Sequence, residues 1–294
     1  MSKLDKTSVT YVNSLLNCEF ALGTLTGVGF ADSAFLAAIT PSFNQLFVTL
    51  LAVTGRNPKA KDKQEEKQQT TSSSQCVVGS LSKFLLRTSE ALIVPLTVGV
   101  VTAPLSLALQ NLAASVEVLS CSERKCTSGA LTTAFLQLMS AVIGESTRVL
   151  QQPTDSSTTT PPFTASQRQA ILASMNRIAQ DLRRLADING KCCCLGSAAM
   201  PLLQLASVLR CMLSPSTAPV VIATGNFLPL FASIDNITTA FLEGILAGLD
   251  ALASCLICRL CKQQRSHCTV DAFALSQDIN ALLQALNAAG FRCA

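Results

Sequence analysis

Residues 164–190 read TASQRQAILASMNRIAQDLRRLADING, and this stretch decides the fold class. Its large apolar residues recur every three or four positions, which is the period of one face of an α-helix. They are Ile171, Met175, Ile178, Leu182 and Leu185, and the opposite face carries Arg168, Arg177, Asp181 and Arg184. Thr164 and Gln167 have the spacing of a capping box, and Gly190 is placed to end the helix. The stretch therefore predicts an amphipathic helix with one buried face.

The same period recurs along the rest of the chain. It is carried by Phe43, Leu46, Phe47, Leu50 and Leu51; by Phe135, Leu138, Met139, Val142 and Ile143; by Ile237, Phe241, Ile245, Leu249 and Leu252; and by Phe273, Leu275, Ile279, Leu282 and Leu286. Thr40-Pro41 predicts a helix start with proline in the first turn, Asp235 or Asn236 opens a helix, and the last runs from Thr269 to Gly290. No β-hairpin signal occurs. We expect an all-α, multi-helix bundle of about eight to ten helices.

Two polar segments divide the chain. Residues 55–75 and 151–163 are rich in charge, Ser, Thr and Pro and lack the apolar surface that offsets ordering entropy. They are predicted to be linkers between helical segments at 1–54, 76–150 and 164–294. The alternative is that both are surface loops of one composite bundle, because 54 residues make a marginal core alone.

The composition is unusually apolar for a globular chain. Of 294 residues, 14% are charged and 49% are hydrophobic, whereas an average domain has about 25% charged residues. Apolar faces in such a chain must bury against copies of the same protein or against lipid. The net charge of +4 and the few aromatic residues argue against nucleic acid as a partner.

Thirteen cysteines punctuate this apolar sequence. Cys121 and Cys126, and likewise Cys261 and Cys268, flank short charged turns, and the second cysteine of each pair is followed by Thr in capping position, so a weak repeat is visible. The candidates for disulfides or cross-links are Cys121, Cys126, Cys192, Cys193, Cys194, Cys261, Cys268 and Cys293. An odd number of cysteines leaves at least one thiol free, metal-bound or intermolecular, and we expect Cys192–Cys194 or Cys293 at a subunit contact.

The cysteines near residue 260 also resemble a metal site in composition. Cys258, Cys261, His267 and Cys268 have zinc-ligand types at ligand-like spacing. The Cys255-x2-Cys258-x2-Cys261 run, however, continues an apolar helix, whereas zinc knuckles lie in turns. We therefore expect structural or cross-linking thiols and no resident metal or cofactor, with a zinc- or redox-sensing binding protein as an alternative.

Residues for catalysis are scarce. The chain has one His, one Tyr and no Trp, and the Cys192–Cys194 run has no neighbouring His or acid. The single imidazole, His267, follows Arg265 in a charged turn and is interpreted as an exposed turn histidine. Separated acids such as Glu117 and Glu123, or Glu243 and Asp250, favour solvated or ion-paired carboxylates. Phosphate-loop and nucleophile-elbow motifs are absent. The sequence predicts that the protein is not an enzyme and has no catalytic residues.

Two uncharged stretches, 91–116 and 211–234, are long enough to span a membrane. Pro95 and Pro104 interrupt the first, the second contains three prolines, and Glu243 and Asp250 lie at mid-length of another apolar helix. An integral membrane protein is therefore the alternative to a self-assembling one. Gly23-x3-Gly27 and Gly244-x3-Gly248 allow close helix approach in either setting.

The N-terminus lacks the apolar segment of a signal peptide, so we expect synthesis in the cytoplasm, with a cell- or spore-surface assembly as one destination. Clusters of cysteine between apolar helices are similar in style to those of cysteine-rich spore-coat and fibre-forming proteins. The sequence thus favours a structural, self-assembling helical protein whose partner is itself, as a homo-oligomer, fibre or coat layer, locked by cysteines once these are oxidised.

Overall fold

The computed structural model describes residues 6–27, 33–54, 71–93, 99–122, 129–151, 164–192, 195–213, 236–260 and 269–291. These residues form nine α-helices and one 3₁₀ helix, with no strand among them. The helices are α1 (Lys6–Gly27), α2 (Ser33–Thr54), α3 (Thr71–Ile93), α4 (Gly99–Ser122), α5 (Gly129–Gln151), α6 (Ala165–Cys192), η1 (Leu195–Ala198), α7 (Ala199–Leu213), α8 (Asn236–Leu260) and α9 (Thr269–Ala288). The predicted all-α class and number of helices are confirmed.

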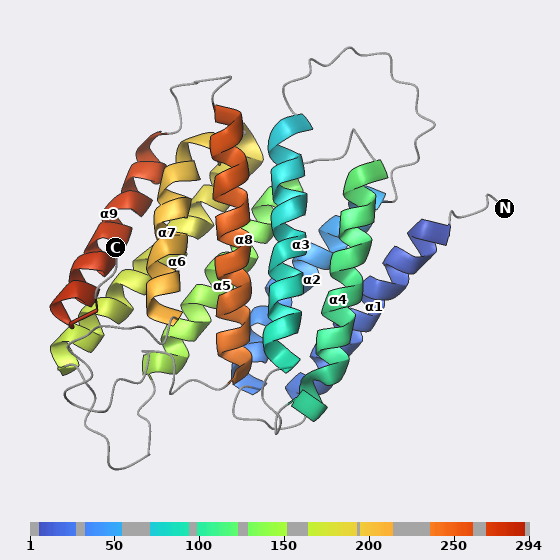
Figure 1. Cartoon of the computed structure of the whole chain (residues 1–294), viewed down its shortest axis with the longest axis horizontal. Coiled ribbons are helices and arrows are strands. Elements are labelled where there is room, and N and C mark those ends of the chain that lie inside the picture. Colours follow the sequence, from blue (N-terminus) through green and yellow to red (C-terminus); the bar gives the residue numbers. More distant parts are fainter. Residues whose placement is uncertain are drawn as a thin grey trace.

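The helices form a closed ring of neighbours arranged as two layers. Around the bundle the order is α1, α4, α3, α8, α7, α9, α6, α5, α2 and back to α1. In Figure 1, α4, α3, α8 and α7 stand side by side, and α1, α2, α5 and α6 make the layer behind them. Helix α5 also contacts α3 and α8, so it joins the layers at the middle of the molecule.

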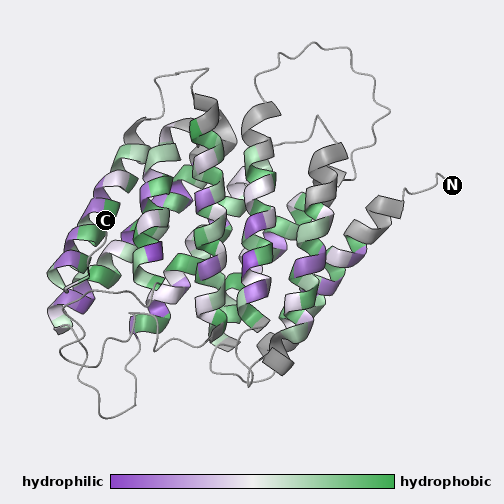
Figure 2. Cartoon of the chain, viewed as in Figure 1, coloured by the Kyte–Doolittle hydropathy of each residue, from purple (hydrophilic) through white to green (hydrophobic). Residues whose placement is uncertain are grey.

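One continuous core fills the space between the layers. It contains buried residues from every helix, including helices of all three sequence segments on either side of the predicted linkers. The apolar residues that carry the helical period on α5, α6 and α8 are all buried, as the pattern predicts. Figure 2 shows the complementary pattern, with hydrophilic residues appearing at mid-length on the viewed faces of α3 and α8.

Phenylalanine rings occupy the centre of this core. Phe241 of α8 contacts Phe35 and Phe43 of α2 and Phe84 of α3, with ring centroids 5.7–6.5 Å apart. Phe84 also contacts Phe43 and, at 5.9 Å, Phe135 of α5. All five side chains are fully buried. Tilted and edge-on aromatic pairs at this separation each contribute about 0.5–1.5 kcal/mol beyond their buried area. The cluster therefore joins two helices of each layer at one point.

Two glycines let α8 approach this cluster closely. A Cβ added at Gly244 would lie 1.9 Å from Thr88 Oγ1 and 3.0 Å from the Phe84 carbonyl oxygen. One added at Gly248 would lie 3.1 Å from Phe84 Cβ and from Phe135 Cζ. Of the two glycine pairs in the sequence, Gly244-x3-Gly248 therefore serves helix packing inside the chain, whereas a Cβ at Gly23 would meet no atom within 4 Å.

The predicted caps of two helices are confirmed. The Thr164 amide donates to Gln167 Oε1 at 2.7 Å, and the Gln167 amide donates to Thr164 Oγ1 at 3.2 Å, which is a capping box. At the other end of the chain Gly290 has a φ of 92°. There the Phe291 amide donates to the Leu286 carbonyl at 2.9 Å, and the Gly290 amide donates to the Asn287 carbonyl at 3.0 Å. This pair of bonds is a Schellman motif, in which glycine relieves the steric cost of a positive φ.

The helix start predicted at Thr40-Pro41 is wrong. Helix α2 begins at Ser33 and runs through Pro41. The turn before the proline buries Phe35, Leu36 and Ile39, so packing holds it helical. Thr40 Oγ1 donates to the Leu36 carbonyl at 2.6 Å, so the hydroxyl next to Pro41 has a hydrogen-bond partner within the same helix.

Several smaller expectations also differ from the structure. Asp181, assigned to the exposed face of its helix, is buried and pairs with Arg184 at 3.2 Å. Phe273, assigned to an apolar face, is 63% exposed because it projects from the outer side of α9. Helix α6 ends at Cys192, two residues beyond Gly190, and α3 begins at Thr71, inside the predicted 55–75 linker. For Asp181 and Phe273 the outcome depends on which side of the helix the rest of the bundle covers, which the local pattern does not report.

Replacing Gly244 by alanine should destabilise the fold by about 1–3 kcal/mol, because the added methyl meets Thr88 and the Phe84 backbone, neither of which can retreat freely. Gly79→Ala is the matched control, since a Cβ at that exposed helical position meets nothing within 4 Å. The control should gain up to about 1 kcal/mol from helix propensity. Urea unfolding followed by circular dichroism measures both. Equal stabilities for the two variants would contradict the close α3–α8 contact.

Candidate functional site

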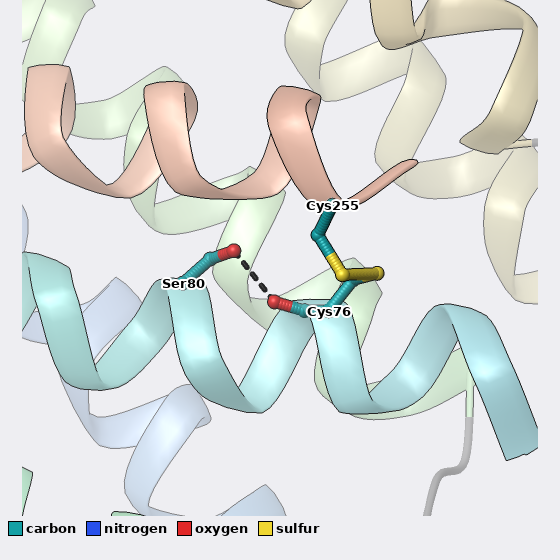
Figure 3. Close-up of a disulfide and its surroundings, with 3 residues drawn as sticks. All are labelled: Cys76, Ser80 and Cys255. Carbon is teal, nitrogen blue, oxygen red and sulfur yellow. Dashed lines mark hydrogen bonds between the residues drawn. A yellow bond between two sulfur atoms is a disulfide. The ribbon is translucent and has the colours of Figure 1, made fainter. Parts of the chain in front are cut away.

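A disulfide joins the two central helices. Cys76, near the start of α3, and Cys255, near the end of α8, have their sulfur atoms 2.07 Å apart and their Cα atoms 5.5 Å apart (Figure 3). Gly248 contacts Phe84 and Gly244 contacts Thr88, so residue numbers fall on α3 as they rise on α8. The two helices are therefore antiparallel, and the disulfide closes one end of their contact.

The surroundings of the disulfide are apolar on one side and open on the other. Cys76 is 2% exposed and belongs to the core, whereas Cys255 is partly exposed. Ser80 is also buried, and its hydroxyl donates to the Cys76 carbonyl at 2.5 Å, one turn back on the same helix (Figure 3). Val77 and Leu81 continue the buried face of α3 beside it. The bond thus lies at the edge of the core.

Charged groups on α8 are paired with neighbouring helices. Glu243 lies 2.7 Å from an Arg87 guanidinium nitrogen of α3, and Asp250 lies 3.4 Å from one of Arg210 on α7. All four side chains are at least partly exposed, so each pair contributes about 1 kcal/mol or less. These two acids, which the sequence leaves as separated carboxylates, are ion-paired residues that help set the position of α8 between α3 and α7.

Most of the sequence-predicted cysteines lie at the limits of the described helices. Cys121 is in the last turn of α4, Cys192 ends α6, and Cys258 is in the last turn of α8, with no side-chain description for any of them. Cys126, Cys193, Cys194, Cys261, Cys268 and Cys293 lie outside the described residues, as does His267. Among the described side chains no group of three potential metal ligands occurs.

The pairing of Cys76 with Cys255 was missed by the sequence analysis. The two residues are 179 positions apart, and neither is in a charged turn of the kind that marked the other candidates. The available signal was weak: each cysteine begins or continues an apolar face of a predicted helix. Two further described cysteines differ from this pair. Cys211 on α7 is disulfide-bonded, with a partner outside the described side chains, and Cys18 on α1 is a buried free thiol.

One described helix meets the length and composition of a membrane span. It is the Ile237–Ile257 part of α8, about half of which is buried inside the bundle. The stretch at 91–116 that the sequence suggested is divided, since α3 ends at Ile93 and α4 begins at Gly99 with Pro104 inside it. The stretch at 211–234 lies mostly outside the described residues.

Comparison of the chain with family models, with characterised proteins and with solved structures found no match. The site is therefore interpreted from its own geometry.

Removing the disulfide with Cys76→Ser/Cys255→Ser should lower the free energy of unfolding under oxidising conditions by about 3–5 kcal/mol, because the bond closes a loop of 179 residues in the unfolded chain. Guanidinium titration with and without dithiothreitol measures the difference. In reductant the variant and the wild type should converge. Equal stability without reductant would show that the bond is not formed in solution.

Burial raises the pKa of the Cys18 thiol from its ordinary 9.0 to about 12. The thiol should therefore resist iodoacetamide at mildly alkaline pH in the native state and react at once in urea. Because the folded-state pKa is the higher one, its contribution to stability is full below pH 9.0 and is lost as the pH rises toward 12. Mass spectrometry of the Cys18 peptide after timed labelling checks this, and fast native labelling would contradict the burial of α1 against the core.

Proposed function

We propose that this protein is a structural subunit that associates with copies of itself and is locked by its cysteines. The observation that supports the proposal is an exposed strip along α1, here called the α1 strip: Asn13, Leu16, Asn17, Phe20 and Gly23, with the exposed Glu19 at its edge. The five strip residues are spaced three and four apart, so they share one face of the helix. An exposed face with prominent apolar side chains is typical of a protein interface.

The apolar members of the α1 strip are prominent. Phe20 is 75% exposed and Leu16, one turn before it, is 53% exposed. A Cβ at Gly23, one turn further on, would meet no atom within 4 Å, so the backbone there can be approached closely by another helix. Burying a phenylalanine in a contact removes about 150–250 Å² from water. The strip therefore offers a partner helix both apolar area and room.

Charged residues occupy the outer faces of α3 and α6, whereas the exposed described positions of α2 and α4 are uncharged. On α3 the exposed positions include Lys83, Arg87 and Glu90, and on α6 they include Arg183 and Arg184. The remaining exposed large apolar side chains of the described chain are Val48, Leu107, Met200 and Phe273, each on a different helix. Single apolar residues of this kind are ordinary on a protein surface. Among the described helices only α1 carries two large apolar side chains that are more than half exposed, and this pair favours α1 as the association face.

The rest of the bundle suits a rigid building unit. Leu92, Leu105 and Leu109, from a stretch that the sequence left in need of a partner, are buried within their own chain. The Cys76–Cys255 disulfide holds α3 to α8 at the edge of the core, and an aromatic cluster joins both layers at its centre. Self-association therefore does not have to complete the fold, and the α1 strip is left to make the contact between copies.

A membrane protein is the second candidate, supported by the span-like composition of α8. Against it, α8 carries Glu243 and Asp250 in ion pairs with Arg87 and Arg210 at partly exposed positions. Lys83 is exposed four residues before Arg87, on a face that would meet lipid. Charges at such depths are costly in a bilayer. Extraction of the expressed protein in detergent-free buffer favours the structural subunit, and a strict detergent requirement favours the membrane protein.

Replacing Phe20 by aspartate should weaken self-association about tenfold or more, because it removes the most exposed apolar side chain of the α1 strip and adds a charge that must be desolvated. Phe273→Asp on α9 is the matched control, since Phe273 is 63% exposed but stands alone. Sedimentation equilibrium in reductant gives the dissociation constant of each variant without disulfide effects.

Circular dichroism on the same samples should show unchanged helicity for both variants, since neither side chain is in the core. A wild-type protein that stays monomeric at high micromolar concentration in reductant would defeat the proposed self-association. Equal weakening by Phe20→Asp and Phe273→Asp would place the contact elsewhere.

A further inference from the structure

Cys211 of α7 forms a disulfide, and the arrangement of the helices limits which cysteine is its partner. Cys76 and Cys255 are bonded to each other, and Cys18 is a free thiol. The Cα atoms of a disulfide lie within about 7 Å of each other, so position decides among the other cysteines of the chain. These are Cys121, Cys126, Cys192, Cys193, Cys194, Cys258, Cys261, Cys268 and Cys293, whose side chains are not described.

Helices α6 and α9 are antiparallel. Gln167, near the start of α6, donates from Nε2 to the carbonyl of Ala288, at the end of α9. Further along, Arg177 Nε lies 2.6 Å from a carboxylate oxygen of Asp278. Helix α6 therefore ends where α9 begins. We call this end of the bundle the upper end, as it is drawn in Figure 1, and the opposite one the lower end.

Helix α7 runs from the upper end to the lower end. Only residues 193–198 separate α6 from α7, so α7 begins close to the end of α6. The short helix η1 in this link contacts α8 and α9, and α7 then packs along the same two helices. In agreement, Gln204 in the second turn of α7 accepts a hydrogen bond from Ser276 in the third turn of α9. At a rise of about 1.5 Å per residue, Cys211 lies ~18 Å below the start of α7.

Helices α4 and α8 also end at the upper end. Helix α8 is antiparallel to α3, as the contacts of its two glycines show. Helix α4 is antiparallel to α3 as well, because Ser82 donates to the Ala113 carbonyl and Ser89 donates to the Ser106 carbonyl. The ends of α4 and α8 thus lie where α3 begins, and Figure 1 shows that this is the upper end.

All the candidate partners except Cys293 are held near the upper end by their place in the chain. Cys121, Cys192 and Cys258 are in the last turns of α4, α6 and α8, and the others, apart from Cys126, directly follow or precede a helix there. Each residue adds at most about 3.6 Å of reach, so none of these comes within disulfide distance of Cys211. Cys126 follows α4 and precedes α5, whereas the main neighbours of α7 are α8 and α9.

Cys293 follows the helix that ends at the lower end. Helix α9 ends at Ala288, and Phe291, the last described residue, packs against the core beyond it. Cys293 comes two residues later and is therefore within about 7 Å of Phe291. Helix α9 extends about 30 Å from the upper end, as η1 and α7 do together, so Cys211 lies beside the last turns of α9. Neighbouring helix axes are about 8–10 Å apart, which brings Cys211 and Cys293 within reach of each other.

We propose that Cys211 is bonded to Cys293 of the same chain and that this disulfide fastens the chain beyond α9 to the last turn of α7. The assignment does not depend on the proposed self-association, and it removes Cys293 from the subunit contact that the sequence predicted. The bundle then has a disulfide at each end: Cys76–Cys255 holds α8 to α3 at the upper end, and Cys211–Cys293 holds α9 to α7 at the lower end. Both bonds lie within one subunit, so oxidation stabilises the subunit itself.

Formation of this bond balances with a small disulfide such as oxidised glutathione as the oxidant. The Cys293 thiolate attacks oxidised glutathione, forms a mixed disulfide and releases one glutathione thiolate. The Cys211 thiolate then attacks the Cys293 sulfur and releases the second glutathione thiolate. Two protein thiols thus lose two electrons and two protons to one glutathione disulfide, which becomes two glutathione thiols, and dithiothreitol reverses the reaction.

Peptide mapping of the oxidised full chain isolates this bond from the others. Free thiols are blocked with N-ethylmaleimide, and the protein is unfolded and digested with trypsin and endoproteinase Asp-N without reductant. Trypsin cuts after Arg210 and Arg292 and Asp-N cuts before Asp235, so residues 211–234 form a peptide with Cys211 as its single cysteine. The expected product is this peptide linked to the one that begins at Cys293. A 211–234 peptide that is linked to another cysteine, or that carries N-ethylmaleimide, would overturn the proposal.

The same digest distinguishes a bond within one chain from a bond between two chains. Equal amounts of ¹⁴N- and ¹⁵N-labelled protein are reduced, mixed and oxidised with oxidised glutathione before digestion. The linked product should carry one label throughout. A product that combines the two labels comes from two chains and would contradict the assignment.

Variants give a second readout. In Cys293→Ser the Cys211 thiol loses its partner, so its labelling by iodoacetamide in urea without reductant should rise about tenfold or more over the wild type. Cys268→Ser is the matched control, because Cys268 directly precedes α9 at the upper end, and it should leave Cys211 unlabelled. Circular dichroism should show equal helicity for both variants. Labelling of Cys211 in Cys268→Ser, or its absence in Cys293→Ser, would defeat the proposed bond.

Discussion

The close contact between α3 and α8 is the constraint on which the bundle depends. Gly244 and Gly248 remove two side chains where α8 crosses Phe84 and Thr88, and the rings of Phe84 and Phe241 then meet those of the second layer. The Cys76–Cys255 disulfide closes one end of the same contact. Because a methyl group at Gly244 would collide with backbone as well as side chain, the spacing of these two helices is not adjustable, and the helices around them must fit it.

Hydroxyl groups supply much of the polar bonding between helices in this charge-poor chain. Ser82 and Ser89 of α3 bond to carbonyls of α4, and Ser140 and Thr133 of α5 bond to carbonyls of α6. Each of these bonds satisfies a hydroxyl that is removed from solvent without introducing a charge into the core. The chain can therefore bury long helix–helix contacts with 14% charged residues. Its interhelical ion pairs, such as Arg87–Glu243, are at partly exposed positions, and among the described pairs Asp181–Arg184 has a buried carboxylate.

The fact that one chain buries its own core has consequences for the proposed function. A core that is complete within one chain leaves exposed apolar side chains on the outer faces of α1, α2 and α4. The proposed role uses the α1 strip for reversible association between copies. Phe20 of this strip is 75% exposed, so it contributes little to the packing of the single subunit.

The sequence by itself determined the helical class, the buried faces of α5, α6 and α8, the capping box at Thr164 and the glycine cap at Gly290, because all of these depend on residues within a few positions of one another. Only the tertiary structure decided that α2 continues through Pro41, that Asp181 is buried and that Cys76 pairs with Cys255. Each of these outcomes is set by a neighbour on another helix or an earlier turn. Local periodicity records which face of a helix is apolar, but it does not record which helix covers that face, and that choice is made by packing.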